Sequence, residues 1–301
     1  MKCDICPTER MARSIYCPAC YDLVEQKPEG RARVASLKRA RREDGFHCEY
    51  CGALLNLSDP SDPLFIHFDH PIPGLRDWVV ATGAIINQSK TNLTYLEYPY
   101  VVHEAVNHWD TGDPFRKDAV PFSKWAAGRR IVRPTSARLV DQALGPRLLD
   151  AGLLRPAGMG KACLVCRRYA VADNGRYCWR CRPLVWRNTG DSWQVKVGAL
   201  RNAYRAELDN FVDYHLGVRL DLFDWSSPFY PNFDHLIPGM KGNLVLTSTL
   251  ANEMKTDTDV PEWHAYFRML DAAFQGGAFE RGKLEFKYWK RTNELKVRKV
   301  A

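Results

Sequence analysis

A chain of 301 residues is long enough for two domains of ordinary size, and its 46% hydrophobic residues and nine tryptophans exclude a disordered protein. No apolar run reaches the roughly 18 residues of a membrane helix, and the first residues lack the apolar core of a signal peptide. We therefore expect an intracellular, cytoplasmic protein without a membrane partner. The net charge of +8 favours a polyanion such as nucleic acid as partner.

Eight of the ten cysteines form four Cys-x-x-Cys pairs, which come in two groups of two. Without an export signal this spacing favours metal binding over disulfides. Two such pairs place four sulfurs around Zn²⁺ at tetrahedral corners and leave no position for water, so each group predicts a structural zinc site. The alternatives are reduced cysteines in the core or an iron centre. The expected ligands are Cys3, Cys6, Cys17 and Cys20 in the first group, and Cys163, Cys166, Cys178 and Cys181 in the second.

A basic helix is predicted after each cysteine group. Apolar residues recur at helical spacing over 34–40 and again over 197–203. The other faces carry cations that either are simply solvated or contact phosphates: Arg31, Arg33, Lys38, Arg39, Arg41, Arg42, Arg201 and Arg205.

The segments after the two helices are similar to each other. Residues 52–74 and 217–239 align without a gap, and 12 of the 23 pairs are identical, including Phe-Asp-His at 68–70 and 233–235. The chain is therefore predicted to be an internal duplication with an α+β fold. We expect domains at 1–110 and 161–301, the second with a basic tail, joined by a helical connector at 111–160.

The second copy continues with a pattern of strand, short loop, strand and helix. Asp234 and His235 end the first strand, Asn243 lies in the loop, and Asn252 and Lys255 share a face of the helix. This arrangement resembles the HNH nuclease family, whose ββα-metal site combines an Asp-His pair, a loop Asn, and an Asn or His on the helix.

The resemblance implies a role for each of these residues. Asp234 and Asn252 would hold Mg²⁺ or Mn²⁺, and His235 would be the general base for the attacking water. Asn243 would orient His235 and tie the loop, and Lys255 would neutralise phosphate charge. Next to such a site, phosphate contacts become the favoured role of the basic helix.

The first copy contains the same pair, Asp69 and His70. Asn92 precedes Leu93 as Asn243 precedes Leu244, which predicts a loop with an insertion, 22 residues long. His103 would then be the metal ligand on the helix, with no lysine three residues later.

Many HNH proteins hold a further zinc through one Cys-x-x-Cys before the Asp-His pair and another near the helix. Cys48 and Cys51 match the first half, but the second half is missing. They are either reduced thiols in the core or part of a zinc site completed by His108 or His67. The second copy has no cysteine at the four positions, which we expect at Asp213, Leu216, Ser248 and Ala251. His47, His215 and His264 are predicted to be structural.

The resemblance implies a DNA endonuclease that cuts duplex DNA as a monomeric pseudo-dimer, similar to zinc-bearing HNH restriction enzymes of prokaryotic or phage-like origin. Each copy would cut one strand, which predicts sequence-specific double-strand breaks. The alternatives are a phage or homing endonuclease, a nicking or junction-resolving enzyme, and a zinc-containing DNA-binding protein with degenerate nuclease sites.

Overall fold

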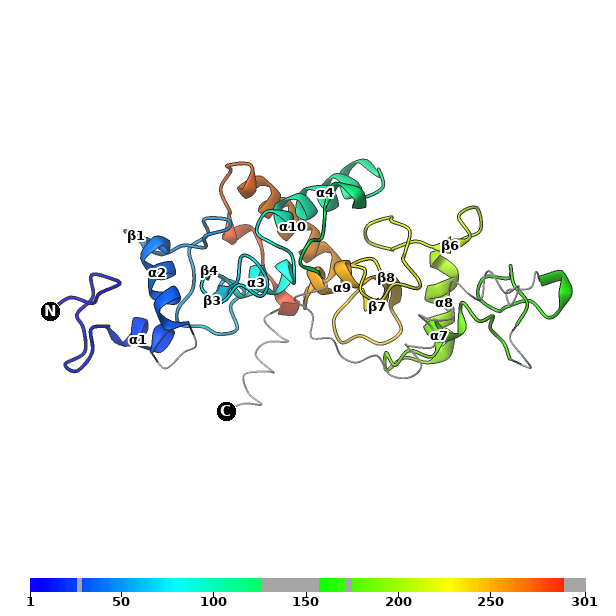
Figure 1. Cartoon of the computed structure of the whole chain (residues 1–301), viewed down its shortest axis with the longest axis horizontal. Coiled ribbons are helices and arrows are strands. Elements are labelled where there is room, and N and C mark those ends of the chain that lie inside the picture. Colours follow the sequence, from blue (N-terminus) through cyan, green and yellow to red (C-terminus); the bar gives the residue numbers. More distant parts are fainter. Residues whose placement is uncertain (26–28, 126–156, 172–174, 290–301) are drawn as a thin grey trace. The chain divides into compact units, whose positions relative to one another are not determined.

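The computed structural model describes residues 1–25, 29–125, 157–171 and 175–289 (Figure 1). Short antiparallel hairpins and helices make up these residues, which confirms the predicted α+β class. Most of the expected connector (126–156) and the end of the basic tail (290–301) lie outside the described residues.

The elements follow the same order twice. The first half contains α1 (Pro18–Val24), α2 (Gly30–Ala40), β1 (Arg41–Arg42), β2 (Gly45–Phe46), β3 (Ile66–Asp69), β4 (Val80–Gly83), α3 (Ala84–Lys90), α4 (Glu97–Thr111) and η1 (Lys117–Ala119). The second half contains η2 (Ala157–Met159), α7 (Arg182–Val185), α8 (Trp193–Ala203), β5 (Tyr204–Arg205), β6 (Asn210–Phe211), β7 (Pro231–His235), β8 (Leu244–Ser248), α9 (Thr249–Lys255), α10 (Val260–Phe274) and η3 (Arg281–Lys283).

The two Asp-His hairpins have the same register. Asp69 pairs with Val80 across β3–β4, and Asp234 pairs with Val245 across β7–β8, so partners have the same separation along the chain. The next helix follows each hairpin without a linker. The insertion expected in the first loop is therefore wrong, because β4 begins at Val80 and Asn92 lies beyond the helix.

The duplication continues without a gap, at a constant offset of 165 residues, into the helices that follow. Thr91 and Thr256 end α3 and α9 with positive φ angles of 52° and 56°. The following helices begin with the same reciprocal cap. Thr94 and Glu97 bond each other's backbone N–H, at 3.3 and 2.9 Å, and Asp259 and Glu262 form a capping box.

After α4 and α10 the repeat persists at an offset of 164. Gly112 and Gly276 have φ angles of 81° and 91°, Phe122 and Phe286 have φ angles of 48° and 49°, and each copy ends at a buried tryptophan, Trp125 or Trp289. Residues 112–125 thus correspond to 276–289 and are not the helical connector expected for this stretch. We call 1–125 the first repeat and 157–289 the second repeat.

The chain divides into two compact units, and each unit contains parts of both repeats. The described part of unit 1 covers residues 1–25, 29–106, 119–125 and 254–289, and that of unit 2 covers 107–118, 157–171 and 175–253. In unit 1, Ser89 of α3 hydrogen-bonds Tyr98 of α4 at 2.6 Å and Tyr266 of α10 at 3.1 Å, all buried. The core of unit 1 therefore includes a helix from the second repeat.

Unit 2 likewise contains a segment from the first repeat. Trp109 Nε1 donates to His215 O at 2.8 Å, and Phe115 packs against Phe229 with ring centroids 6.0 Å apart. A continuous apolar core joins the second cysteine group to α8 and the β7–β8 hairpin through buried Leu200 and Leu246. None of the helices among the described residues is long and apolar enough to cross a membrane.

Candidate functional site

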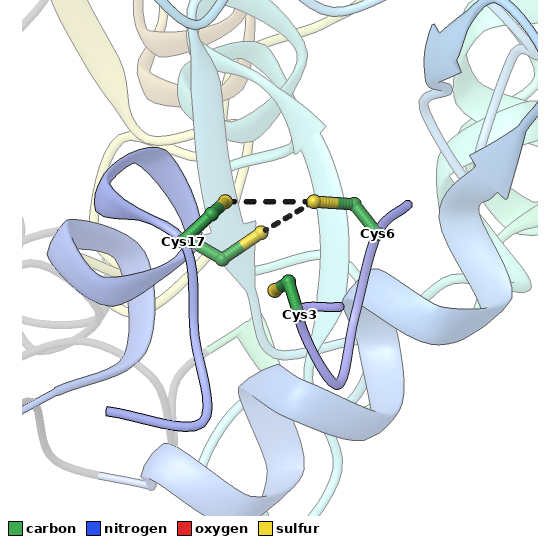
Figure 2. A group of neighbouring side chains, drawn as sticks. Cys3, Cys6 and Cys17 are labelled. Carbon is green, nitrogen blue, oxygen red and sulfur yellow. Dashed lines mark hydrogen bonds between the residues drawn. The ribbon is translucent and has the colours of Figure 1, made fainter. Parts of the chain in front are cut away.

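Each cysteine group brings its four sulfurs together. In both groups all four sulfurs lie within 4.8 Å of one another. Figure 2 shows the first group, in which Cys6 Sγ is 3.5 Å from Cys17 Sγ. Sulfurs at the corners of a tetrahedron around zinc would be about 3.8 Å apart for bonds of about 2.3 Å. Both groups could therefore hold a structural zinc ion, with the eight cysteines predicted from the sequence as ligands.

Backbone N–H groups further support thiolate sulfur in these groups. Ile5 N lies 3.4 Å from Cys3 Sγ, and Val165 N lies 3.4 Å from Cys163 Sγ, the same contact in both repeats. A hydrogen bond from an N–H to a sulfur stabilises the charged form that binds metal.

The Cys48–Cys51 pair forms a similar turn, with Tyr50 N 3.4 Å from Cys48 Sγ. Within the described residues, however, this pair belongs to no group of three or more metal-ligating side chains. His67 faces Asn87 Nδ2 at 3.5 Å, and His108 Nδ1 lies 2.6 Å from the carbonyl oxygen of Asp113. Neither histidine completes a zinc site, so the described structure supports buried thiols.

In the second repeat a buried carboxylate occupies the position of Cys48. Asp213 Oδ1 accepts hydrogen bonds from the backbone N–H of His215 and Leu216 at 2.6 and 2.8 Å, and Oδ2 accepts from Thr247 Oγ1 at 3.0 Å and from Ser248 N. The Asp213 side chain thus links the turn to the start of α9. A zinc ion with cysteines at these positions would link the same two segments.

The Asp-His pair of the second repeat has a partner for each member. His215 Nε2 lies 2.9 Å from Asp234 Oδ2, and His235 Nε2 lies 2.7 Å from Asp191 Oδ2. Asp191 precedes α8, and its other oxygen accepts from Gly242 N in the β7–β8 loop at 2.9 Å. The hydrogen bond from Gly242 and the contact with His235 lower the pKa of Asp191, so the carboxylate is ionised near neutral pH.

Asn243 closes the β7–β8 loop. With its amide oriented to suit its neighbours, it donates to Met240 O at 2.7 Å and accepts from Ile237 N at 3.2 Å. Its backbone oxygen also accepts from Leu236 N, next to His235. The loop that carries His235 is therefore fixed from both sides.

Asn252 and Lys255 both lie on α9, as their spacing predicted, but the lysine does not face solvent. Lys255 is 1% exposed, which does not suit the expected contact with a phosphate. Lys90, at the same place in the first repeat, shows what a buried lysine does here. Its Nζ lies 3.2 Å from Asp69 Oδ2 and also donates to Leu93 O.

Asp69 is buried between Lys90 and Tyr50. Tyr50 Oη donates to Asp69 Oδ2 at 2.5 Å, from the position that His215 has in the second repeat. Burial raises the pKa of Asp69, and the charge of Lys90 opposes this rise; burial likewise lowers the pKa of Lys90, against the effect of Asp69. Lys90 is thus the counter-ion that makes a buried carboxylate tolerable.

His70 repeats the contact that His235 makes. Its Nε2 lies 3.1 Å from both carboxylate oxygens of Glu29, the residue before α2. Sequence reasoning missed Glu29 and Asp191, because each lies about 40 residues before its histidine and nothing in the local sequence links them.

Two residues expected at the first site lie elsewhere. Asn92 follows α3 and so lies outside the β3–β4 loop, and His103 is on α4, where its Nδ1 contacts Asp271 at 3.1 Å. Asn87 and Lys90 have the positions on α3 that Asn252 and Lys255 have on α9. The constant offset of 165 residues, extended beyond His70, predicts both Asn87 and Lys90 from the sequence. The same offset places Trp78 where the second repeat has Asn243.

The basic helix α2 is partly neutralised by its own unit. Lys38 pairs with Asp4 and Arg39 with Glu49, each at 2.8 Å. Arg33 lies over the Phe68 ring, 4.6 Å from its centroid, and its Nε has no hydrogen-bond partner among the described residues. In the second repeat Arg201 and Arg205 donate to the backbone oxygens of Leu164 and Asn202. Arg33, beside the Asp-His pair, is the best placed of these cations for a phosphate.

Searches against protein-family models, curated proteins and solved structures find no match to this chain.

Proposed function

We propose that this chain is a divalent-metal-dependent DNA endonuclease of the HNH type. One observation carries the proposal. An Asp-His pair at the end of a hairpin strand occurs twice, with a carboxylate on each histidine and an asparagine at the same position of the next helix. A histidine with a purely structural role needs only a hydrogen-bond partner such as the carboxylate. Both repeats contain more than that: a histidine that can act as base, a carboxylate that orients it, and an aspartate and an asparagine that can supply oxygen ligands to a metal ion.

His235 and His70 are the proposed general bases. Asp191 and Glu29 each hold one ring nitrogen, which fixes the imidazole and stabilises the imidazolium that forms when the ring takes a proton from water. We assign these two carboxylates a positioning role, since they would act on the reaction only through the histidine.

The residues also suit a hard cation with oxygen ligands. Asp234 with Asn252, and Asp69 with Asn87, would each supply a carboxylate and an amide oxygen, and Mg²⁺ or Mn²⁺ typically keeps water and substrate phosphate in its other positions. In the first repeat Tyr50 and Lys90 both contact Oδ2 of Asp69, which leaves Oδ1 for the ion. The bound ion would stabilise negative charge on the phosphate and the leaving oxygen.

Other side chains hold the site together. Lys90 and Lys255, both buried, balance charge inside the protein and do not contact the substrate in this proposal. Arg33 is the proposed phosphate ligand of the first site, because its guanidinium lies over Phe68, the residue before the Asp-His pair, and a guanidinium can pair with phosphate oxygens. The two zinc ions, each held by four cysteines, would be purely structural.

Two sites in one chain make double-strand cleavage the expected outcome, in the manner of a restriction enzyme. A nicking enzyme is the second candidate, because Trp78 replaces the loop-closing Asn243 in the first repeat. Supercoiled plasmid incubated with Mg²⁺ separates the two. Linear DNA formed together with nicked circles indicates two active sites, while nicked circles that persist indicate one. If no metal supports cleavage of plasmid, duplex or branched DNA, the endonuclease proposal fails.

A further inference from the structure

The second zinc module (161–185) and the residues just after it carry two sets of arginine stacked on tryptophan, which together we call the Arg–Trp cluster. Its members are Arg176, Trp179, Arg182, Trp186 and Trp193. The Arg182 guanidinium lies 5.0 Å from the Trp186 ring centroid and 5.4 Å from that of Trp179, and Arg176 lies 5.4 Å from that of Trp193. Trp186 is 69% exposed and Trp193 is 42% exposed. Both rings are therefore accessible to a partner.

The stacking prepares the arginines for an anion. A guanidinium that lies flat on an aromatic ring keeps its N–H donors at the edge, where they can form paired hydrogen bonds to phosphate oxygens. Stacking also limits the motion of a long side chain, so less entropy is lost on binding. Neither Arg176 nor Arg182 forms an ion pair with a described residue, so their charge is not neutralised within the described chain.

The first zinc module provides an internal comparison. Residues 161–185 contain six Lys and Arg against one Asp, whereas residues 1–24 contain three Lys and Arg against three Asp and Glu. Aligned on the second cysteine pair of each module, Pro18, Tyr21 and Glu25 stand where the second repeat has Trp179, Arg182 and Trp186. A four-cysteine module therefore does not require the cluster for its fold, and the cluster is a property of one repeat.

We propose that the Arg–Trp cluster is a docking surface for the phosphate backbone of duplex DNA. Charge decides the kind of partner, because each exposed ring is paired with a cation and the module around it is strongly basic. A protein partner would need acidic groups to match the same surface, and the test below distinguishes the two. The inference rests on the proposed function only in choosing DNA as the polyanion.

Binding is measured on the full-length, zinc-loaded chain without added Mg²⁺, by fluorescence anisotropy of a labelled duplex of about three helical turns over a series of NaCl concentrations. The double variant R176Q/R182Q should weaken binding about tenfold or more near 0.1 M salt and flatten the slope of log K against log [salt] by about two units. The matched control, K2Q/R13Q, removes the same charge from exposed positions of the first module and should change affinity less than about twofold. W186L, which keeps the charge, should weaken binding by a smaller factor.

Zinc content and circular dichroism of each variant check that the fold is intact. Equal losses in the two double variants would show a general charge effect and overturn the proposal, as would an unchanged salt slope in R176Q/R182Q. Failure of the wild-type chain to bind duplex DNA would overturn it in favour of a protein partner. Binding that depends on the cluster without any cleavage would leave this proposal intact and overturn only the nuclease.

Discussion

The β3–β4 hairpin of the first repeat and the β7–β8 hairpin of the second have the same register, yet the side chains around their Asp-His pairs differ, and four of these differences affect contacts of the hairpin. In three of these differences, the aspartate, the histidine or the threonine of the hairpin keeps a contact, but a different residue type makes it. The aspartate is bonded by Tyr50 or His215, the histidine by Glu29 or Asp191, and Thr82 or Thr247 faces Cys48 or Asp213. A contact that survives a change of residue type points to a requirement of the site itself.

The fourth change removes a contact. Asn243 bonds Met240 and Ile237 in its loop, whereas Trp78 packs against Tyr95 with ring centroids 5.2 Å apart. The first loop is thus held by an aromatic contact from beyond the hairpin, and the second by hydrogen bonds within the loop and to Asp191. The difference between the two sites is concentrated in how the loop after the histidine is held.

The largest expected effect comes from removing each base. His235→Ala should slow cleavage of one strand by about 10²- to 10⁴-fold, because no other group would take the proton from water. His70→Ala should do the same for the other strand if both sites are active. Strand-specific end labels on a duplex substrate measure the two rates. Unchanged rates in both variants would contradict the site assignment.

Asn87 and His103 test which residue completes the first site. Asn87→Ala should reduce first-site cleavage and metal affinity by about 100-fold, since a metal ligand is lost. His103→Ala is the matched control and should have little effect, because His103 contacts Asp271 on the surface of unit 1. Titration of Mn²⁺ into each variant measures the metal affinity. The reverse result would restore the sequence-based assignment of His103.

Substitutions of Asp213 and Cys48 test how strongly each side chain links its turn to the following hairpin. Asp213→Ala should destabilise the protein by about 2 kcal/mol or more, because buried donors from four residues lose their acceptor. Cys48→Ala should cost about 1 kcal/mol, since thiol hydrogen bonds such as those with Thr82 and Tyr50 N are weak. Urea unfolding monitored by tryptophan fluorescence gives both values. A greater loss for Cys48→Ala would point to a metal at that cysteine.

Asp191→Asn tests the positioning role. Without the negative charge the imidazolium is less stable, and we expect kcat to fall about tenfold while KM and the salt dependence of DNA binding stay unchanged. Asp191→Glu should recover part of the rate, because the first repeat makes the same contact with Glu29. A purely structural role for Asp191 predicts a loss of thermal stability in place of the change in kcat.

The smallest effect is expected at the position that separates the two loops. Trp78→Asn should raise the ratio of linear to nicked plasmid by a few-fold, since loop hydrogen bonds contribute about 0.5–1.5 kcal/mol each. The converse variant, Asn243→Trp, should lower it. If neither ratio moves, loop closure does not determine the difference between the sites.

Much of the organisation follows from residue spacing. The two four-cysteine groups, the α+β class and the hairpin whose first strand ends at His235 all depend on contacts between residues close in sequence, so residue spacing alone predicts them. Asn87 and Lys90 were also readable, but the resemblance of Asn92-Leu93 to Asn243-Leu244 drew the alignment away from the constant offset. A gapless duplication is a stronger guide to equivalent residues than a local match of two residues.

Other features depend on the folded chain and have no local signature. The contacts of Glu29 and Asp191 with the histidines join segments about 40 residues apart. Burial of Lys90 and Lys255 also follows from tertiary packing. From the sequence alone, a lysine close to catalytic motif residues is predicted to bind phosphate, and only the structure shows that these two side chains are buried. His215 was expected to be structural, and its bond to Asp234 could not be read from its spacing.

The division of each repeat between the two units bears on how the protein assembles. Trp263, Tyr266 and Phe267 of α10 are buried in unit 1, although they come from the second repeat. A fragment ending at residue 125 would expose buried Ser89 and Tyr98, and a fragment starting at residue 157 would carry Tyr266 without these two hydrogen-bond partners. Neither half should be stable alone, whereas the two expressed together should complement each other. Such mutual dependence is what a domain-swapped homodimer would leave behind once its two subunits were fused into one polypeptide.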